Sequence, residues 1–204
     1  MILNARNFLV CALLAMLAAC AHAGDGASPP VAQKRVALTF DDAPRAPGAF
    51  LSKDERTRRL IASLKKAGVD QAAFFINPGN IKSADDERRI ASYVDAGHVL
   101  ANHSATHPDL SETPSDTYIA DIDAAETWLR EHEGHRPWFR YPYLDEGGQD
   151  KAKRDAVRNA LAARGLTNGY VTIDASDWCY EAAAIEAVAQ GKSIDRAALC
   201  DLYV

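Results

Sequence analysis

Short apolar runs alternate with longer amphipathic stretches along most of this chain, and few folds are compatible with that alternation. The apolar runs are strand-like and lie at 35–40, 72–76, 98–101, 138–140 and 169–174. Helical patterns occupy 52–67, 83–96, 113–132, 150–164, 180–190 and 193–203. Strands that alternate with helices form parallel sheets joined by helical crossovers. The sequence therefore predicts an α/β fold.

Capping signals set the expected limits of these helices. Ser52 is followed three residues later by Glu55, which is a capping box, and Gly68 ends the same helix. Thr113 precedes Pro114, so we expect Thr113 to cap the longest helix and Pro114 to occupy its first position.

The N-terminal residues read as a targeting segment rather than as part of the fold. Residues 1–23 combine one early basic residue with a short apolar run and small residues, as secretory signals do. Cleavage after Ala23 by an ordinary signal peptidase and lipidation of Cys20 after a lipobox-like sequence both fit. The Gly/Ser/Pro-rich residues 24–33 predict a flexible tether, which leaves 34–204 as the folded domain. We expect an exported protein, either periplasmic or anchored to the outer membrane as a lipoprotein through Cys20.

Charge and cysteine content restrict the function further. The 204 residues carry a formal net charge of -5, which argues against a nucleic-acid partner because such proteins are basic. Cys179 and Cys200 are the cysteines of the predicted domain, and in an oxidising compartment they are candidates for a disulfide. A disulfide and two free thiols are both compatible with the sequence.

Polar residues follow four of the five predicted strands, where the active sites of parallel α/β folds lie. They include Asp41 and Asp42 after the first strand, His103 and His107 after the third, Arg140 after the fourth, and Asp174 and Asp177 after the fifth. Two histidines and a carboxylate are a typical ligand set for Zn²⁺. An Asp-Asp pair before Ala-Pro also fits a solvated turn, and a His-x-x-x-His spacing alone is weak. The strand-end position of these residues together favours a metal site.

Four motifs, in order, resemble those of the polysaccharide deacetylases, which form carbohydrate esterase family 4. The motifs are Thr39-Phe40-Asp41-Asp42, His103-Ser104-Ala105-Thr106-His107, Arg140-Tyr141-Pro142-Tyr143 and Asp174-Ala175-Ser176-Asp177-Trp178. They span most of the predicted domain. The resemblance implies a distorted (β/α) barrel of about seven strands.

The resemblance also implies a role for each motif residue. Asp42, His103 and His107 would hold one divalent metal ion, with Zn²⁺ the expected ion. For the other five, Asp41 would be the general base, Arg140 would orient it, Tyr143 would bind the oxyanion through its backbone N–H, Asp177 would tune a catalytic histidine and Trp178 would line the acetyl pocket. The implied activity is a metal-dependent hydrolase that removes acetyl groups from an N- or O-acetylated polysaccharide or oligosaccharide, such as a chitooligosaccharide or peptidoglycan.

The chain departs from the family pattern at two points. Ala43 stands where the family usually has glycine before proline. No histidine follows Trp178, so the fifth motif, Leu-x-Leu-His, which supplies the general acid, is absent from the sequence. We therefore expect a C-terminally truncated barrel that lacks its last strands and has at best weak activity. The alternative is a non-catalytic carbohydrate-binding pseudoenzyme whose short length is natural.

Overall fold

A computed structural model describes residues 35–203 of the chain. The predicted signal segment (1–23) and tether (24–33) lie outside the described residues. The predictions that concern export and a lipid on Cys20 therefore have no structural counterpart here.

Strands and helices alternate along the described residues, as the apolar pattern predicts. The strands are β1 (Thr39–Ala43), β2 (Ala73–Ile76), β3 (Val99–Asn102), β4 (His135–Phe139) and β5 (Thr167–Asn168). The helices are α2 (Lys53–Lys66), α3 (Ala84–Asp95), α4 (Ser115–Leu129), α5 (Lys151–Ala163), α6 (Asp177–Ala189) and α7 (Arg196–Tyr203). Two short 3₁₀ helices, η2 (Pro78–Asn80) and η3 (Pro142–Leu144), follow β2 and β4.

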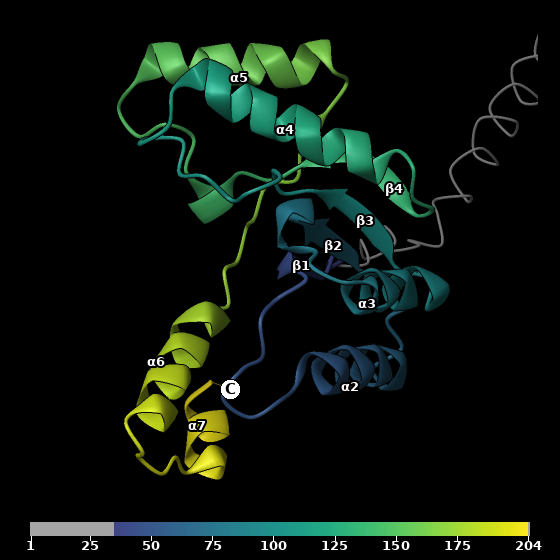
Figure 1. Cartoon of the computed structure of the whole chain (residues 1–204), viewed down its shortest axis with the longest axis vertical. Coiled ribbons are helices and arrows are strands. Elements are labelled where there is room, and N and C mark those ends of the chain that lie inside the picture. Colours follow the sequence, from purple (N-terminus) through teal and green to yellow (C-terminus); the bar gives the residue numbers. More distant parts are fainter. Residues whose placement is uncertain (1–34, 204) are drawn as a thin grey trace, which may run out of the picture. The chain divides into compact units, whose positions relative to one another are not determined.

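The strands form one parallel sheet in the order β1-β2-β3-β4-β5, so neighbours in sequence are neighbours in the sheet (Figure 1). Parallel connections of one hand between successive strands place the connecting helices on one face, as in a (β/α) barrel. Within residues 35–203 the sheet stays open, with β1 and β5 as its edges. This architecture confirms the predicted α/β class and the distorted barrel type.

The core lies between the sheet and helices α2 to α5. Phe74, Ile76 and Leu100 of the sheet pack against apolar side chains of α2, α3 and α4. Phe139 packs with α4 and α5 in a second cluster. The opposite face of the sheet carries a smaller cluster that includes Phe75. Phe75 of this cluster lies next to two motif residues, with Arg140 over its ring and His103 edge-on to it.

The predicted helix starts at Ser52, Ser83 and Asp150 are confirmed by their side-chain caps, and the cap predicted at Thr113 is wrong. The Ser52 side chain accepts a hydrogen bond from the Glu55 N–H at 3.2 Å, and the Ser83 side chain accepts one from the Asp86 N–H at 3.3 Å. Thr113, however, does not cap α4, because Pro114 occupies the cap position and Ser115 is the first helical residue.

The fifth strand differs most from its prediction. The strand expected at 169–174 is instead the two-residue β5, at Thr167–Asn168. The Gly169 N–H still bonds to the Phe139 carbonyl at 2.7 Å, but β4 ends at Phe139, and the Gly169 carbonyl accepts the Nε–H of Arg140 at 2.8 Å. Because β4 ends at Phe139, residues 170–174 have no β4 residues with which to pair. The first strand is shifted too, because β1 runs to Ala43 and so contains Asp41 and Asp42.

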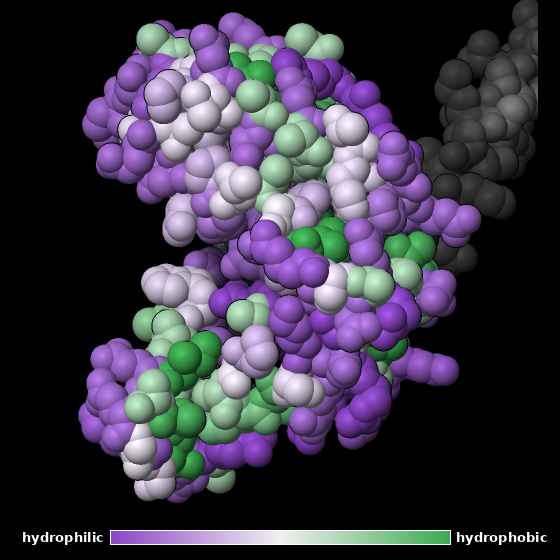
Figure 2. Space-filling view, in the orientation of Figure 1, coloured by the Kyte–Doolittle hydropathy of each residue, from purple (hydrophilic) through white to green (hydrophobic). Residues whose placement is uncertain are grey.

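The last two helices carry exposed apolar side chains. Ile185, Val188 and Leu202 are exposed on α6 and α7, where Figure 2 shows a group of green atoms. Cys179 and Cys200 are both free thiols and both exposed, so the structure has the unpaired alternative rather than the disulfide. None of the helices in the described part of the chain has the length and apolar character needed to cross a bilayer.

Candidate metal and catalytic site

A bulge at the end of β1 turns two consecutive carboxylates toward one site. The pairing of β1 with β2 shifts by one residue between Phe40 and Ala43, so Asp41 and Asp42 lie in the irregular segment. Asp42 has a φ of 61°, in the left-handed region that side-chain-bearing residues rarely adopt. Successive side chains of a regular strand point to opposite faces, and a bulge can redirect one of them. This irregularity allows both carboxylates to approach the same histidine.

The two histidines lie on a loop after β3, not on a helix. Residues 103–107 have no helical turn, and Ser104 and His107 have φ values of 63° and 61°. The Nε2 atom of His107 lies 3.0 Å from Asp42 Oδ1, and that of His103 lies 3.4 Å from the same oxygen. The loop, with two residues in the left-handed backbone region, thus brings the two imidazoles together. The His-x-x-x-His spacing alone would do so only on one face of a helix.

The proton of His103 can be located from its backbone partner. Its Nδ1 lies 2.8 Å from the carbonyl oxygen of Arg140, which can only accept, so Nδ1 carries the proton and donates. In the neutral ring the lone pair is therefore on Nε2, which faces the carboxylates. A hydrogen bond of this kind fixes ring orientation in metal-binding histidines.

The atoms of Asp42, His103 and His107 fit a metal ion. One ligand atom from each residue lies within 4.8 Å of the other two. Asp42 Oδ1 is buried and has no hydrogen-bond donor among the described residues. A carboxylate oxygen and a nitrogen lone pair this close need a proton or a cation between them. Two imidazoles and one carboxylate are the donor set that Zn²⁺ accepts, with room for a further ligand.

The electrostatics of the site also favour a ligand role for Asp42. Burial raises the pKa of the Asp42 carboxyl, but its contacts with His103 and His107 outweigh burial and hold the pKa well below its usual range. Asp42 is therefore ionised at neutral pH, as a metal ligand must be.

Arg140 lies behind the first carboxylate and holds it. This buried guanidinium donates from Nη1 to Asp41 Oδ1 at 2.5 Å and to the Thr39 hydroxyl at 2.8 Å, and from Nε to the Gly169 carbonyl. It also lies over the Phe75 ring, 3.9 Å from the ring centre. The other carboxylate oxygen of Asp41, Oδ2, lies 4.0 Å from His103 Nε2. The Arg140 side chain thus fixes Asp41 at the edge of the metal-ligand cluster, while its backbone carbonyl bonds to His103 within that cluster.

The remaining predicted site residues fall into two groups. Tyr143, in η3, is exposed, has a φ of 57°, and packs edge-on to the His107 ring at 4.5 Å between ring centres. Asp177 and Trp178 begin α6, and both side chains are exposed. Among the described residues, neither makes a hydrogen bond or ion pair with the Asp42 cluster. The structure thus brings Tyr143 to the cluster but not Asp177 or Trp178.

Sequence reasoning missed two buried asparagines that shape the histidine loop. Asn77, after β2, donates from its side chain to the carbonyls of His103 and Ser104 at 2.6 and 3.1 Å. Asn102 accepts the Ser104 N–H at 2.8 Å and donates to the Ile122 carbonyl at 3.0 Å. Both are fully buried at strand ends. That position, a polar residue directly after an apolar run, is the sequence signal that could have identified them.

Comparison with known proteins decides the family. Residues 28–168 match the family model described as polysaccharide deacetylase. The chain belongs to the polysaccharide deacetylase family.

Individual deacetylases of the family are similar to this chain over part of their length. It is 28% identical over 151 residues to a peptidoglycan-N-acetylglucosamine deacetylase of Bacillus cereus, covering 74% of this chain and 49% of that protein. It is 33% identical over 113 residues to a chitin deacetylase of Colletotrichum lindemuthianum, covering 53% of this chain and 42% of that protein. The chain therefore spans about half the length of these curated relatives, or less.

A solved structure supports the same fold for this family member. It is the family 4 carbohydrate esterase from Streptomyces lividans, in complex with acetate, with 29% identity and a TM-score of 0.55. The match covers 74% of this chain and 69% of that one. The polysaccharide deacetylase fold thus accounts for the parallel sheet and its one-sided helices.

Proposed function

We propose that this chain is a metal-dependent hydrolase that removes acetyl groups from an N- or O-acetylated polysaccharide or oligosaccharide. The observation that carries the proposal is the convergence of Asp42, His103 and His107 next to the Asp41–Arg140 pair. One group of residues would hold a metal ion, and the other would handle a proton at its edge. The family supports a deacetylase, and the donor set supports the metal.

Asp42, His103 and His107 would be the metal ligands, with Zn²⁺ the expected ion. A bound zinc ion polarises a carbonyl oxygen and lowers the pKa of a water molecule toward about 7. The protein contributes the geometry, since His103 is oriented by the Arg140 carbonyl and His107 by the Ser104 hydroxyl, which accepts its backbone N–H at 3.1 Å.

Asp41 would act as the general base. One of its oxygens is held by Arg140, which leaves the other free to accept a proton from the attacking water. Arg140 is buried and held on three sides, so the base is oriented before substrate arrives. Attack on the acetyl carbonyl places negative charge on its oxygen, which the backbone N–H of Tyr143 would stabilise. As the C–N or C–O bond to the acetyl carbon breaks, the leaving nitrogen or oxygen must take up a proton, and the products are acetate and a free amine or hydroxyl.

Two further roles in the proposal rest on the motif resemblance. Trp178 would line the acetyl pocket, and Asp177 would tune a catalytic histidine of the fifth motif, which is absent from this sequence. For both roles, α6 would have to present these residues to the site.

The substrate class follows from the relatives. Curated relatives are named as peptidoglycan and chitin deacetylases, so we propose an acetylated glycan of the same kind, such as peptidoglycan or a chitooligosaccharide. Such polymers lie outside the cytoplasm, which agrees with the proposed export signal at 1–23. The proposed location is the periplasm or, through a lipidated Cys20, the outer membrane.

Metal analysis and acetate release test the proposal together. We expect purified protein to bind about one divalent ion, and His103→Ala and Asp42→Ala to lose it. His132→Ala is the matched control, because His132 stacks on Trp128 and bonds to its carbonyl, outside the cluster. Acetate release should be measured on chitooligosaccharide, peptidoglycan and acetylated xylan. Wild-type protein that binds no divalent ion would overturn the metal site, whereas glycan binding without acetate release would favour the non-catalytic alternative.

A further inference from the structure

Two residues of the loop that carries His107 have an unfavourable backbone conformation. Ser104 and His107 both lie in the left-handed region, with φ values of 63° and 61°. This conformation is unfavourable for residues with a side chain, and it persists where surrounding contacts enforce it. Asn77 and Asn102 bond to the Ser104 end of the loop. At the His107 end, the Ser104 hydroxyl accepts the His107 N–H at 3.1 Å from within the loop, so a partner that fixes this end to the rest of the fold has to come from another element.

Asp121, on helix α4, supplies that partner. Its Oδ2 accepts the backbone N–H of Thr106 at 2.9 Å, and its Oδ1 accepts the Thr106 hydroxyl at 2.9 Å. Its backbone carbonyl also accepts the N–H of Ala105, at 3.2 Å. A single helical residue therefore holds the two loop residues directly before His107 through three hydrogen bonds.

The charge of Asp121 has no other partner in the described part of the chain. Within residues 35–203 it makes no ion pair, whereas Asp123, two residues later on the same helix, pairs with Arg164 at 2.5 Å. Hydrogen bonds to an ionised carboxylate are roughly twice as strong as neutral ones. The Asp121 carboxylate thus acts on the loop alone.

We propose that Asp121 is a positioning residue that holds His107 within reach of Asp42 by fixing Thr106. It touches neither the metal-ligand cluster nor any reacting atom, so it acts only through the loop. The importance of this role for metal binding rests on the proposed function. Partners that orient ligands from outside a metal site typically change metal affinity 10–100-fold when they are removed.

Zinc affinity, measured by competition with a chromophoric chelator, tests the proposal. Asp121→Ala should raise the zinc dissociation constant about 10–100-fold while one ion still binds at saturation. Asp123→Ala is the matched control, since it removes an ion pair from the same helix but leaves the loop untouched. Asp123→Ala should keep the zinc dissociation constant within about twofold of wild type, even if it lowers the melting temperature as much as Asp121→Ala does. Equal zinc affinity in wild type and Asp121→Ala would overturn the proposal.

A second measurement separates this inference from the proposed function. In metal-free protein, Asp121→Ala should speed hydrogen exchange in the peptide that covers 103–107, and Asp123→Ala should not. Thr106→Val, which keeps the N–H but removes the hydroxyl, should give a smaller change in the same direction. If wild type binds no zinc but the exchange result holds, the metal function fails and the loop contact stands. Unchanged exchange in Asp121→Ala would overturn the positioning role itself.

Discussion

Asp41 and Asp42 are adjacent in sequence, yet their carboxylates have different partners. Asp41 bonds to the guanidinium of Arg140, and Asp42 lies against His103 and His107. The bulge at the end of β1 makes this separation possible, because it turns one carboxylate without moving the other out of the site. Each acid therefore has an environment that suits the task proposed for it, proton transfer for Asp41 and metal binding for Asp42.

This separation predicts that the two functions can be removed independently. Asp41→Asn keeps the shape of the side chain but cannot accept the proton, so we expect kcat to fall about 10²–10⁴-fold. The bound metal should remain at about one ion per chain, because Asp41 is not among the proposed ligands. Steady-state acetate release and metal analysis of the same preparation check both outcomes. Loss of the ion in Asp41→Asn would contradict the assignment of separate roles.

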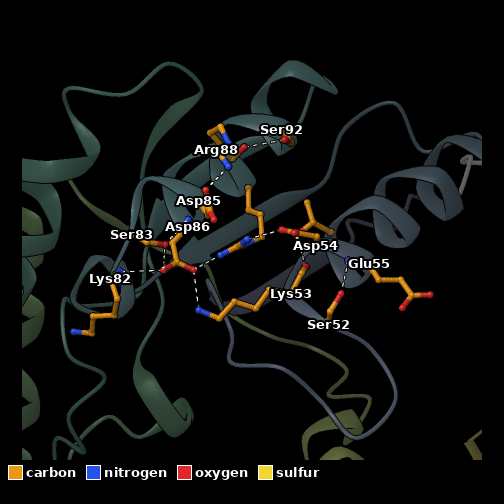
Figure 3. Close-up of polar contacts among 12 residues, drawn as sticks. Ser52, Lys53, Asp54, Glu55, Lys82, Ser83, Asp85, Asp86, Arg88 and Ser92 are labelled. Carbon is orange, nitrogen blue, oxygen red and sulfur yellow. Dashed lines mark hydrogen bonds and ion pairs between the residues drawn. The ribbon is translucent and has the colours of Figure 1, made fainter.

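At the scale of the elements, helices α2 and α3 are joined by a buried carboxylate (Figure 3). Asp86, which is 1% exposed, pairs with Lys53 of α2 at 2.9 Å and with Arg89 of α3 at 2.6 Å. It also accepts the backbone N–H of Lys82 at 3.1 Å. These hydrogen bonds, above all those from Lys53 and Arg89, hold the pKa of Asp86 well below its usual range in spite of burial. The network fixes the start of α3 against α2.

Removal of this carboxylate should cost much more stability than removal of its neighbour. Asp86→Ala leaves Lys53 and Arg89 without their shared partner, and we expect the free energy of unfolding to fall by about 3 kcal/mol. Asp85→Ala is the matched control, because the Asp85–Arg88 pair is exposed and should contribute no more than about 1 kcal/mol. Urea unfolding of both variants at neutral pH measures the difference. Equal losses would contradict a structural role for the buried network.

The same network predicts how stability depends on pH. The folded-state pKa of Asp86 is lowered, so its contribution is complete above the unfolded-state pKa of about 4 and is lost as pH falls toward the folded-state value. Wild type should therefore lose stability below about pH 4 more steeply than Asp86→Asn. Urea midpoints across the acid range compare the two slopes, and parallel curves would argue against this coupling.

At the scale of the whole molecule, the candidate metal site exists only after the sheet has assembled. Asp42 lies near the end of β1, while His103 and His107 follow β3, with β2 between the two strands. Arg140, whose carbonyl orients His103, comes from the end of β4. An unfolded chain would hold these groups far apart. A metal ion should therefore bind the folded state in strong preference to the unfolded one.

Metal binding should then stabilise the fold by mass action. At a free zinc concentration 100 times the dissociation constant, the gain is about 2.7 kcal/mol, which corresponds to roughly 5–10 °C in melting temperature for a domain of this size. Thermal unfolding with a chelator and with added zinc measures the shift. His132→Ala should keep the shift and His103→Ala should lose it. A shift of the same size in His103→Ala would mean that zinc binds elsewhere.

Local patterns were enough to predict most elements, because a strand or helix depends on residues close in sequence. Ser52 caps α2 as its capping box indicates, and the apolar run at 72–76 becomes β2. The largest error lies where a distant contact outweighs a local pattern. The run at 169–174 is not a strand, because β4 ends at Phe139 and Arg140 binds the Gly169 carbonyl. The predicted cap at Thr113 is wrong for a local reason, because the neighbouring Pro114 occupies the cap position.

The sequence by itself determined the α/β class, the order of the elements and the presence of carboxylates, histidines and an arginine at strand ends. Only the tertiary structure decided which of these groups meet. The bulge that separates the partners of Asp41 and Asp42, the support from Asn77 and Asn102, and the hold of Asp121 on the histidine loop all join residues from different strands and helices. Such contacts depend on strand register and helix packing, which no short stretch of sequence encodes. For the same reason, the structure leaves Asp177 and Trp178 at the start of α6, apart from the cluster that their motif resemblance implies.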